Sequence, residues 1–304
     1  MKSNFDLPDF IVVGYSRSST SWLYEALKKN DRIFLPDRKE LHFYDRNYKE
    51  GLEFYNKYFS SAADGLSKGD ITPVYTEYEG IAEKIHADMP NVKIIIILRN
   101  PLDRLKSIFL QLVRDGKFSK DFKSLLIKDN KLTEFTKAQF YSDTVLTYLS
   151  LFGTNQVHIA IYDDFVSKPE EYVTGIADFL LVNDDDWVKN ISEVFDKKAN
   201  PTVIPKWFLL HKVVQKCNQK LRLQHNNSLD KILNKCHSIY RKIFLSSSIS
   251  PDWEIKNNVL IKEIFKDDIV SLGAILNRDL GEEWSFCERS NFTESSLDGG
   301  SNEF

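Results

Sequence analysis

The chain of 304 residues predicts an α/β fold, a single domain with a central, mainly parallel sheet that is flanked by helices. Two apolar runs carry this prediction. Residues 10–13 (FIVV) and 92–98 (VKIIIIL) show no regular polar alternation, as expected of strands that are covered on both faces in a parallel sheet. Each run leads into a polar turn and then a helical segment, which is the strand–loop–helix order of α/β domains.

The composition supports a sizeable core and excludes some classes of function. The chain is 42% hydrophobic and 13% aromatic. A net charge of −3 argues against a general nucleic-acid binder, so no nucleic-acid partner is expected. No apolar run approaches the roughly 18 residues of a membrane span, and the first strand leaves no room before it for a secretory signal.

Three cysteines, Cys217, Cys236 and Cys287, lack the close pairing of a metal site. Reduced thiols in the cytoplasm are the simpler interpretation. A Cys217–Cys236 disulfide in an oxidising compartment is the alternative. We therefore expect a cytoplasmic protein, and a luminal one only if the chain lacks its natural N-terminus.

The segment of residues 10–27 is organised as a strand, a loop and a helix. The loop, residues 14–19, contains one cation, Arg17, and three serines. Amides at the start of the following helix, residues 20–27, carry partial positive charge, so this turn favours a phosphate group. The Gly-Lys-Ser/Thr ending of the nucleotide P-loop is absent, so the segment is only P-loop-like.

Two further segments combine charged side chains with a predicted strand or an aromatic cluster. Glu40 and His42 stand directly against an aromatic run, where a charged pair is less easily explained by core packing. The strand of residues 92–98 ends in Arg99, and Ser107 follows about two helical turns into the next helix. Ligands in open α/β sheets bind beyond the carboxyl ends of strands, which is where Arg99 falls.

The remaining elements follow from apolar periodicity and turn residues. Extended pieces are expected over residues 32–36, 69–75 and 157–162, and the turn at Thr72-Pro73 is either ordinary or part of a cleft lining. Helices are expected from residue 52 onward and over residues 79–88, 141–152, 169–180, 253–265 and 267–276. Residues 115–138 are expected to form a polar, peripheral excursion, and His158 to be a packed histidine.

A basic segment, residues 206–245, departs from the rest of the composition. It holds nine Lys or Arg against one Asp, so it carries +8 and the remainder −11. Its apolar residues recur at helical spacing, which predicts a C-terminal helical hairpin, either a basic insertion or a cap. Three interpretations stay open: a solvated cap, a platform for an anionic acceptor or cofactor, and peripheral contact with an anionic membrane surface.

Four segments resemble sulfotransferases that use 3′-phosphoadenosine 5′-phosphosulfate (PAPS). Residues 14–23 resemble the 5′-phosphosulfate loop of this family, with Arg17 where many members have Lys and Ser19 where they usually have Gly. Residues 39–44 resemble the Lys-Glu-x-His-Phe-Phe segment of glycosaminoglycan-type and bacterial members, and residues 69–75 resemble Gly-Glu-x-(Ser/Thr)-Pro-x-Tyr. Residues 99–107 match the 3′-phosphate motif, Arg-(Asn/Asp)-Pro-x-(Asp/Glu)-Arg-x-x-Ser, at every fixed position.

The resemblance runs almost from residue 10 to residue 284. It implies a sulfotransferase domain over residues 1–287, with the basic segment 206–245 as an insertion or cap. Residues 288–304 are rich in Ser, Asn, Gly and acids, and are predicted to be a disordered tail. The excursion of residues 115–138 would then face the acceptor side.

The resemblance implies in-line transfer of a sulfuryl group from PAPS, with PAP as product, to a hydroxyl or, as second choice, an amine of a carbohydrate, lipid or small-molecule acceptor. Arg17 would stabilise charge on the leaving phosphate, Glu40 would be the general base, and His42 its helper or substitute. No metal ion is implied. The residues implied in PAPS binding are Arg17, Ser18, Ser19, Thr20, Ser21, Trp22, Arg99, Ser107, Tyr162 and Lys198. The alternatives are a non-catalytic PAPS- or PAP-binding protein and a P-loop-like nucleotide kinase.

Overall fold

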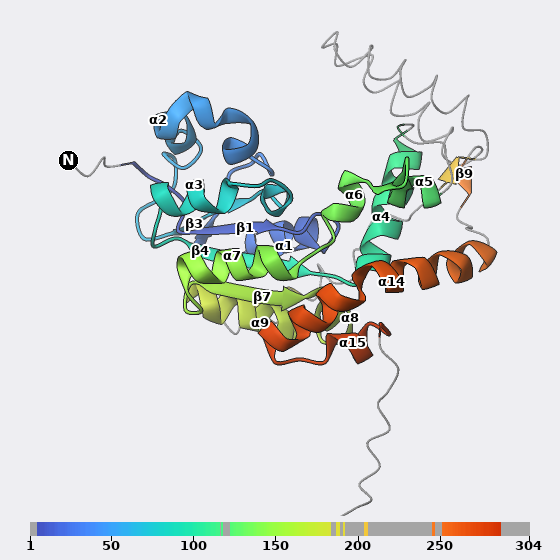
Figure 1. The fold of residues 1–304 in the computed structure, drawn as a ribbon. Helices are drawn as coiled ribbons and strands as arrows, with labels where there is room; N and C mark the ends of the chain where they lie inside the picture. The colour runs from blue at the N-terminus through green and yellow to red at the C-terminus, as the bar shows by residue number, and fades with distance from the viewer. Residues whose placement is uncertain are drawn as a thin grey trace, which may run out of the picture.

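Figure 1 shows the computed structural model, which describes residues 5–115, 117, 122–183, 187–188, 191, 204–205, 245–246 and 251–286. A central sheet is flanked by helices, so the α/β prediction is confirmed. Within these ranges, no helix combines the length and the apolar character needed to cross a lipid bilayer.

The central sheet has five parallel strands in the order β2-β3-β1-β4-β7. Their bounds are Phe10–Gly14 for β1, Ile33–Phe34 for β2, Ser67–Ile71 for β3, Lys93–Leu98 for β4 and Val157–Ile161 for β7. The two strands with the longest apolar runs, β1 and β4, are central, as those runs predict. Two short antiparallel pairs lie outside this sheet: β5 (Ile127–Lys128) with β6 (Lys131–Leu132), and β8 (Ile204–Pro205) with β9 (Leu245–Ser246).

Several helices begin and end where apolar periodicity and turn residues place them. Both α1 (Thr20–Leu27) and α9 (Pro169–Leu180) span the predicted residues. The other α-helices are α2 (Gly51–Asn56), α3 (Ile81–Asp88), α4 (Pro101–Arg114), α5 (Lys123–Leu126), α6 (Glu134–Lys137), α7 (Ser142–Phe152), α8 (Tyr162–Ser167), α14 (Pro251–Leu276) and α15 (Leu280–Glu283). Shorter helical elements are a π-helix at Phe43–Asn47 and 3₁₀ turns at Tyr48–Glu50 and Tyr75–Glu77.

Several predicted boundaries are wrong. The extended piece expected over residues 69–75 is the strand Ser67–Ile71, which ends before Pro73, since proline has no amide to pair, and the piece expected over residues 32–36 is only Ile33–Phe34. The expected pair of C-terminal helices is one continuous helix, α14, because no Gly or Pro interrupts the chain around residue 266. Tyr162 is the first residue of α8, since the strand before it ends at Ile161. Several predictions lie outside the described residues: those for Lys198, for the three cysteines, for the tail 288–304 and for all of the basic segment 206–245 except Leu245.

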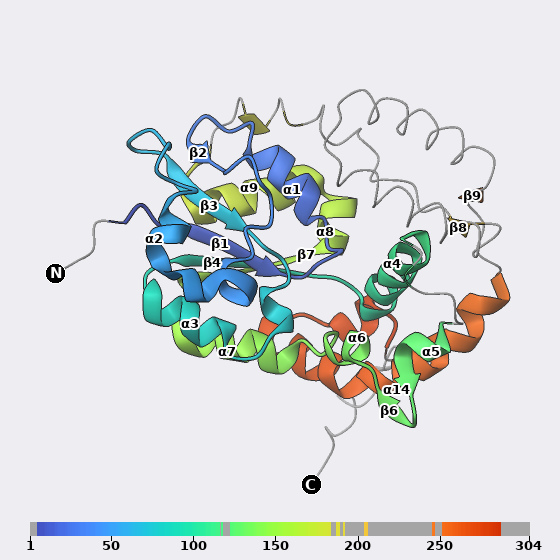
Figure 2. The ribbon, with the colours of Figure 1, turned by 90° about the horizontal axis from the view of Figure 1, so that it is seen from above.

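Alternate residues of the central strands pack against different helices, because successive side chains of a strand point to opposite faces. One set shares a buried cluster with residues of α3, α7 and α14: Ile11, Val13, Ile94 and Ile96. The other set shares a cluster with residues of α1 and α9: Phe10, Val12, Ile95 and Ile97. Figure 2 shows α1 and α9 on one side of the sheet and α3 and α7 on the other. With both faces covered, a ligand has access at the strand ends.

The strand order provides such access at the carboxyl end of β1. From β1 the chain passes to β2 and β3 on one side, and it then crosses to β4 and β7 on the other. The connections that follow β1 and its neighbours therefore diverge at this end of the sheet. A reversal of this kind leaves a crevice, which is where open α/β sheets bind ligands.

A buried carboxylate ties α14 to the start of α7. Asp268 accepts hydrogen bonds from the backbone amides of Tyr141 (2.8 Å) and Ser142 (3.0 Å). The hydroxyl of Ser142 donates to the same carboxylate at 2.5 Å. The first amides of a helix have no partner within it, so a residue far along the chain satisfies them here.

Replacing Asp268 by Ala leaves these buried amides without an acceptor. We expect the free energy of unfolding of Asp268→Ala to fall by about 1–3 kcal/mol, measured by urea unfolding. Asp267→Ala, at the exposed neighbouring position of α14, is the matched control and should change it by less than about 0.5 kcal/mol. Equal losses in the two variants would contradict the capping role.

Candidate functional site

The residues predicted to carry the chemistry lie at the carboxyl ends of four adjacent strands. The amide of Glu40 donates to the carbonyl of Ile71, the last residue of β3, at 3.2 Å. Arg17 follows β1, Arg99 follows β4, and Tyr162 follows β7. Because neighbouring strands lie about 4.8 Å apart, the order β3-β1-β4-β7 lines up Glu40, Arg17, Arg99 and Tyr162 along one edge of the sheet.

The loop of residues 14–19 turns tightly after β1. A Cβ atom at Gly14 would lie 2.2 Å from Thr76 Oγ1, so glycine is required for this close approach. Arg17 and Ser19 both have left-handed backbone, with φ of 69° and 61°. The carbonyl of Ser19 accepts a hydrogen bond from the amide of Leu23, which is the first hydrogen bond of α1. Ser19 therefore holds a conformation that glycine adopts freely and that costs other residues roughly 1–2 kcal/mol.

Arg17, Ser107 and Arg99 lie in direct contact. The Nε of Arg17 donates to Ser107 Oγ at 2.8 Å, and Nη1 of Arg99 donates to the carbonyl of Arg17 at 2.8 Å. Burial lowers the pKa of Arg17, and the positive charges of Arg114 and Arg99 lower it further. The guanidinium groups of Arg99 and Arg114 thus repel that of Arg17, and Asp115 offsets part of this repulsion. Arg114, at the end of α4, was not singled out by its sequence context.

This cluster has the properties that an anion requires. The Nε of Arg99 is buried and makes no hydrogen bond with the described residues, and the same holds for the hydroxyl of Ser18. A buried donor without a partner costs free energy, and a phosphate or sulfate oxygen would satisfy it while neutralising the excess positive charge. The residues present therefore fit an anionic ligand at the carboxyl ends of β1 and β4.

An aromatic group adjoins the cationic cluster. The guanidinium of Arg99 lies 4.2 Å from the centre of the Tyr162 ring. Phe165 lies between Trp22, at 4.6 Å, and Tyr162, at 5.8 Å between ring centres. Aromatic faces beside a cation suit a planar base that carries phosphate. Of the other predicted loop residues, Thr20 is buried and Ser21 is exposed at the start of α1.

Arg104 holds the loop of residues 14–19 in place. Its side chain is fully buried, and it donates to the carbonyls of Ser16 and Ala138 at 2.8 Å each, and to Gln139 Oε1 at 2.7 Å. Its Nη2 pairs with Glu77 Oε1 at 2.5 Å. The motif of residues 99–107 contains Arg104 as a fixed position, and the structure gives that position a positioning role.

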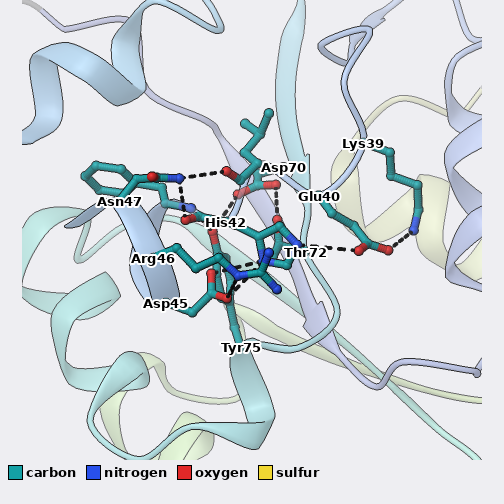
Figure 3. Close-up of polar contacts among 11 residues, drawn as sticks. Lys39, Glu40, His42, Asp45, Arg46, Asn47, Asp70, Thr72 and Tyr75 are labelled. Atoms are coloured by element: carbon teal, nitrogen blue, oxygen red, sulfur yellow. Dashed lines mark hydrogen bonds and ion pairs between the residues drawn. The ribbon is translucent and has the colours of Figure 1, made fainter. Parts of the chain in front are cut away.

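Glu40 and His42 form a polar chain with two residues beside them (Figure 3). Lys39 Nζ lies 2.8 Å from Glu40 Oε1, and His42 Nε2 lies 3.7 Å from Glu40 Oε2. The other ring nitrogen, Nδ1, lies 2.9 Å from Asp45 Oδ2. Asp45 therefore orients the imidazole toward Glu40. Sequence reasoning missed Asp45, although its spacing of three residues from His42 on a helical turn was a usable signal.

A second buried carboxylate supports this chain from β3 (Figure 3). Asp70 accepts hydrogen bonds from the hydroxyls of Tyr55 (2.7 Å), Thr72 (2.7 Å) and Tyr75 (3.2 Å). Burial raises the pKa of Asp70, and the three hydroxyl donors act in the opposite direction. The hydroxyl of Tyr75 also accepts the amide of Phe43 at 2.9 Å. Asp70 and Tyr75 thus fix the segment that presents Glu40 and His42.

A cavity of about 710 Å³ opens beside Arg17. It is lined by residues of the loop after β1, of the segment from Tyr75 into α3, of α4, of residues 134–140 and of α7. We call it the α3–α7 cavity. Arg17 and Tyr75 line it, whereas the described lining does not include Glu40 or His42. Arg17 of the cationic cluster therefore borders the cavity directly. Tyr75 borders it too, and its hydroxyl accepts a hydrogen bond from the amide of Phe43, in the segment that carries Glu40 and His42.

Comparisons with known proteins agree on one family. The profile of a family described as "Sulfotransferase domain" matches residues 7–244. Heparan sulfate glucosamine 3-O-sulfotransferase 5 of Mus musculus is 27% identical over 186 residues, which cover 57% of this chain and 53% of that protein. Membrane-associated sulfotransferase kil1 of Dictyostelium discoideum is 33% identical over 101 residues, covering 32% of this chain and 21% of that protein.

The chain thus spans about half the length of the heparan sulfate relative, and a smaller share of the Dictyostelium one. Among solved structures, a sulfotransferase from Alicyclobacillus acidocaldarius superposes with a TM-score of 0.62 at 21% identity. That likeness covers 91% of this chain and 98% of the other, and it shows the shared fold.

Ser19 offers a test of the loop conformation. Ser19→Gly should raise the free energy of unfolding by up to about 1 kcal/mol in urea unfolding, since glycine adopts a positive φ without steric cost. Ser19→Val should lower it by more than about 1 kcal/mol, because a branched side chain resists this backbone. A stabilising effect of the Val variant would contradict the left-handed conformation.

Proposed function

The chain belongs to the sulfotransferase family, and on that premise we propose that it transfers the sulfuryl group of PAPS to a hydroxyl group of an acceptor. One observation carries the proposal: Arg17, Ser107 and Arg99 meet at the carboxyl ends of β1 and β4, where the buried Nε of Arg99 has no hydrogen-bond partner in the described part of the chain. PAPS carries phosphate at both its 3′ and 5′ positions, and this cluster offers cationic groups from two segments to hold them.

The donor would bind along the edge of the sheet. Arg99 and Ser107 are proposed to hold the 3′-phosphate, as the resemblance of residues 99–107 implies. The loop amides with Ser18, Ser19, Thr20 and Ser21 would hold the 5′-phosphosulfate at the start of α1. Trp22 and Tyr162 would flank the adenine, since both lie in the aromatic group beside Arg99.

Arg17 would stabilise the charge that develops on transfer. The sulfur–oxygen bond to the leaving phosphate breaks as a bond to the acceptor oxygen forms, so negative charge grows on the departing oxygen. An arginine stays protonated, so Arg17 supplies electrostatic stabilisation and does not donate a proton. Its hydrogen bond to Ser107 holds the guanidinium in place before the reaction, and a preorganised group of this kind needs little rearrangement.

Glu40 would take the proton of the acceptor hydroxyl. Its two oxygens face different partners, Lys39 and His42, which hold the carboxylate at the end of β3. His42 is proposed as a positioning group whose own orientation is set by Asp45. The names of the heparan sulfate relatives support an alcohol acceptor, since those proteins are described as 3-O-sulfotransferases.

Removing Arg99 tests the donor site. Arg99→Ala should weaken PAP binding by about 10- to 100-fold, measured by calorimetry, because a charge-assisted contact to phosphate is lost. The preference of this variant for PAP over adenosine 5′-phosphate should fall by a similar factor. Arg38→Ala, at an exposed site outside the cluster, is the control. Normal PAP binding by the Arg99 variant would refute the donor site, and stabilisation of the wild type by ATP with magnesium but not by PAP would favour a kinase.

Removing the charge of Glu40 separates chemistry from donor binding. Glu40→Gln should lower turnover by ~10²–10⁴-fold, the usual contribution of a general base. PAP affinity should stay within about twofold of the wild type. Release of PAP from PAPS would be followed with heparan sulfate and with simple phenols as acceptors. Glu25→Gln, exposed on α1, is the control, and unchanged turnover of the Glu40 variant would exclude the base role.

A further inference from the structure

The α3–α7 cavity has the size of a small-molecule site. Its volume of about 710 Å³ falls within the roughly 300–1,000 Å³ of pockets that enclose small ligands. Arg17 lines one part of it, so a molecule inside the cavity lies next to the group proposed to act on the sulfuryl transfer. The cavity is therefore a described space in which an acceptor would lie beside Arg17.

Negative charge predominates in the lining. Among the described residues, six carboxylates line the cavity against three cations. The carboxylates are Glu77, Glu79, Glu83, Asp115, Glu134 and Asp143, and the cations are Arg17, Lys117 and Lys137. Glu77 is paired with Arg104, and Glu134 with Lys137. Glu79, Glu83 and Asp143 make no ion pair with the described part of the chain, so their charge is available to a ligand.

Aromatic side chains share the cavity with these carboxylates. Tyr78 and Phe135 line it and are 53% and 42% exposed, which is high for such large side chains. Phe140 and Tyr148 line it as well. Aromatic faces carry negative potential and attract ammonium groups, most strongly when water is excluded. Carboxylates and aromatic faces therefore act in the same direction, toward a cation and against an anion.

One lining residue of the same cavity has a buried hydroxyl without a partner among the described residues. Tyr148 is 1% exposed, and its hydroxyl has no hydrogen-bond partner among the described residues. Burial raises the pKa of Tyr148, and the neighbouring Tyr15 and Glu83 raise it further, so the hydroxyl remains a proton donor. The hydroxyl has almost no exposed surface, so a ligand oxygen would reach it only if the side chains that cover it moved.

Resting on the proposed function, we infer that the acceptor is a small hydroxyl-bearing organic cation, bound in the α3–α7 cavity with its ammonium group toward Glu79, Glu83 and Asp143. Its apolar body packs against Tyr78 and Phe135, and its hydroxyl extends past Arg17 toward the end of β3, where Glu40 lies. A polyanionic glycan chain is disfavoured here, because its sulfates and carboxylates would be repelled by the rim carboxylates, as we call Glu79, Glu83 and Asp143. The acceptor thus differs in charge from heparan sulfate, the substrate named for several relatives.

Three phenols that differ mainly in charge test this inference: tyramine, 4-ethylphenol and 4-hydroxyphenylacetate. Binding to the full chain saturated with PAP would be measured by calorimetry, and sulfation would be followed with PAPS. Tyramine should bind at least about tenfold more tightly than 4-hydroxyphenylacetate, with 4-ethylphenol between them. The preference should decrease as salt concentration rises, since the rim carboxylates are exposed.

A triple variant locates the effect. Glu79→Gln, Glu83→Gln and Asp143→Asn together should weaken tyramine binding about tenfold and leave 4-ethylphenol and PAP within about twofold. The matched control removes three exposed carboxylates outside the cavity: Glu25→Gln, Glu53→Gln and Glu170→Gln. It has the same net charge as the triple variant and should bind tyramine like the wild type.

The outcomes separate the two proposals. If PAP binds but tyramine does not, or binds no better than 4-hydroxyphenylacetate, the cationic acceptor is refuted and the donor site stands. Equal losses in the triple variant and its control would also refute it, since the effect would then be one of net charge. If PAP itself does not bind, the proposed function fails, whatever the phenols do.

Discussion

The buried guanidinium of Arg104 is the interaction on which the candidate site depends. It connects the loop after β1, the 3₁₀ turn at Tyr75–Glu77 and the segment between α6 and α7 through hydrogen bonds to Ser16, Glu77, Ala138 and Gln139. A guanidinium that is buried away from water is stable only when its N–H donors all have hydrogen-bond acceptors. The loop after β1 and the wall of the α3–α7 cavity must therefore adopt one relative position.

Both segments that carry the candidate chemistry contain strained backbone. Arg17 and Ser19 in the loop, and Glu40 and His42 beside β3, are all non-glycine residues with positive φ. Such conformations cost free energy and persist only where surrounding contacts enforce them. Arg104 supplies those contacts for the loop, and Asp70 with Tyr75 supplies them for the Glu40 segment. Strain held in this way presents the side chains before a ligand arrives.

Arg17 lies at the boundary between two regions of opposite charge. Toward α4 and β4 it is surrounded by Arg99 and Arg114, which lower its pKa. Toward α3 and α7 it lines a cavity in which carboxylates predominate. An anionic donor and a cationic acceptor would each be attracted to its own side, and their reacting groups would meet at Arg17. This separation of charge would direct the two substrates to opposite sides of Arg17.

The sequence by itself determined the strands of the central sheet, most helices and the spacing of Arg99 and Ser107, because apolar periodicity and turn chemistry act over a few residues. It also placed Glu40 and His42 in one segment. Only the tertiary structure decided what these residues touch. The bond from Arg104 to Ser16 spans 88 residues and the cap from Asp268 to Tyr141 spans 127. No local pattern encodes such pairs, since packing of the whole chain brings them together. The α3–α7 cavity likewise arises from separate stretches of the chain, so its charge and shape exist only in the folded protein.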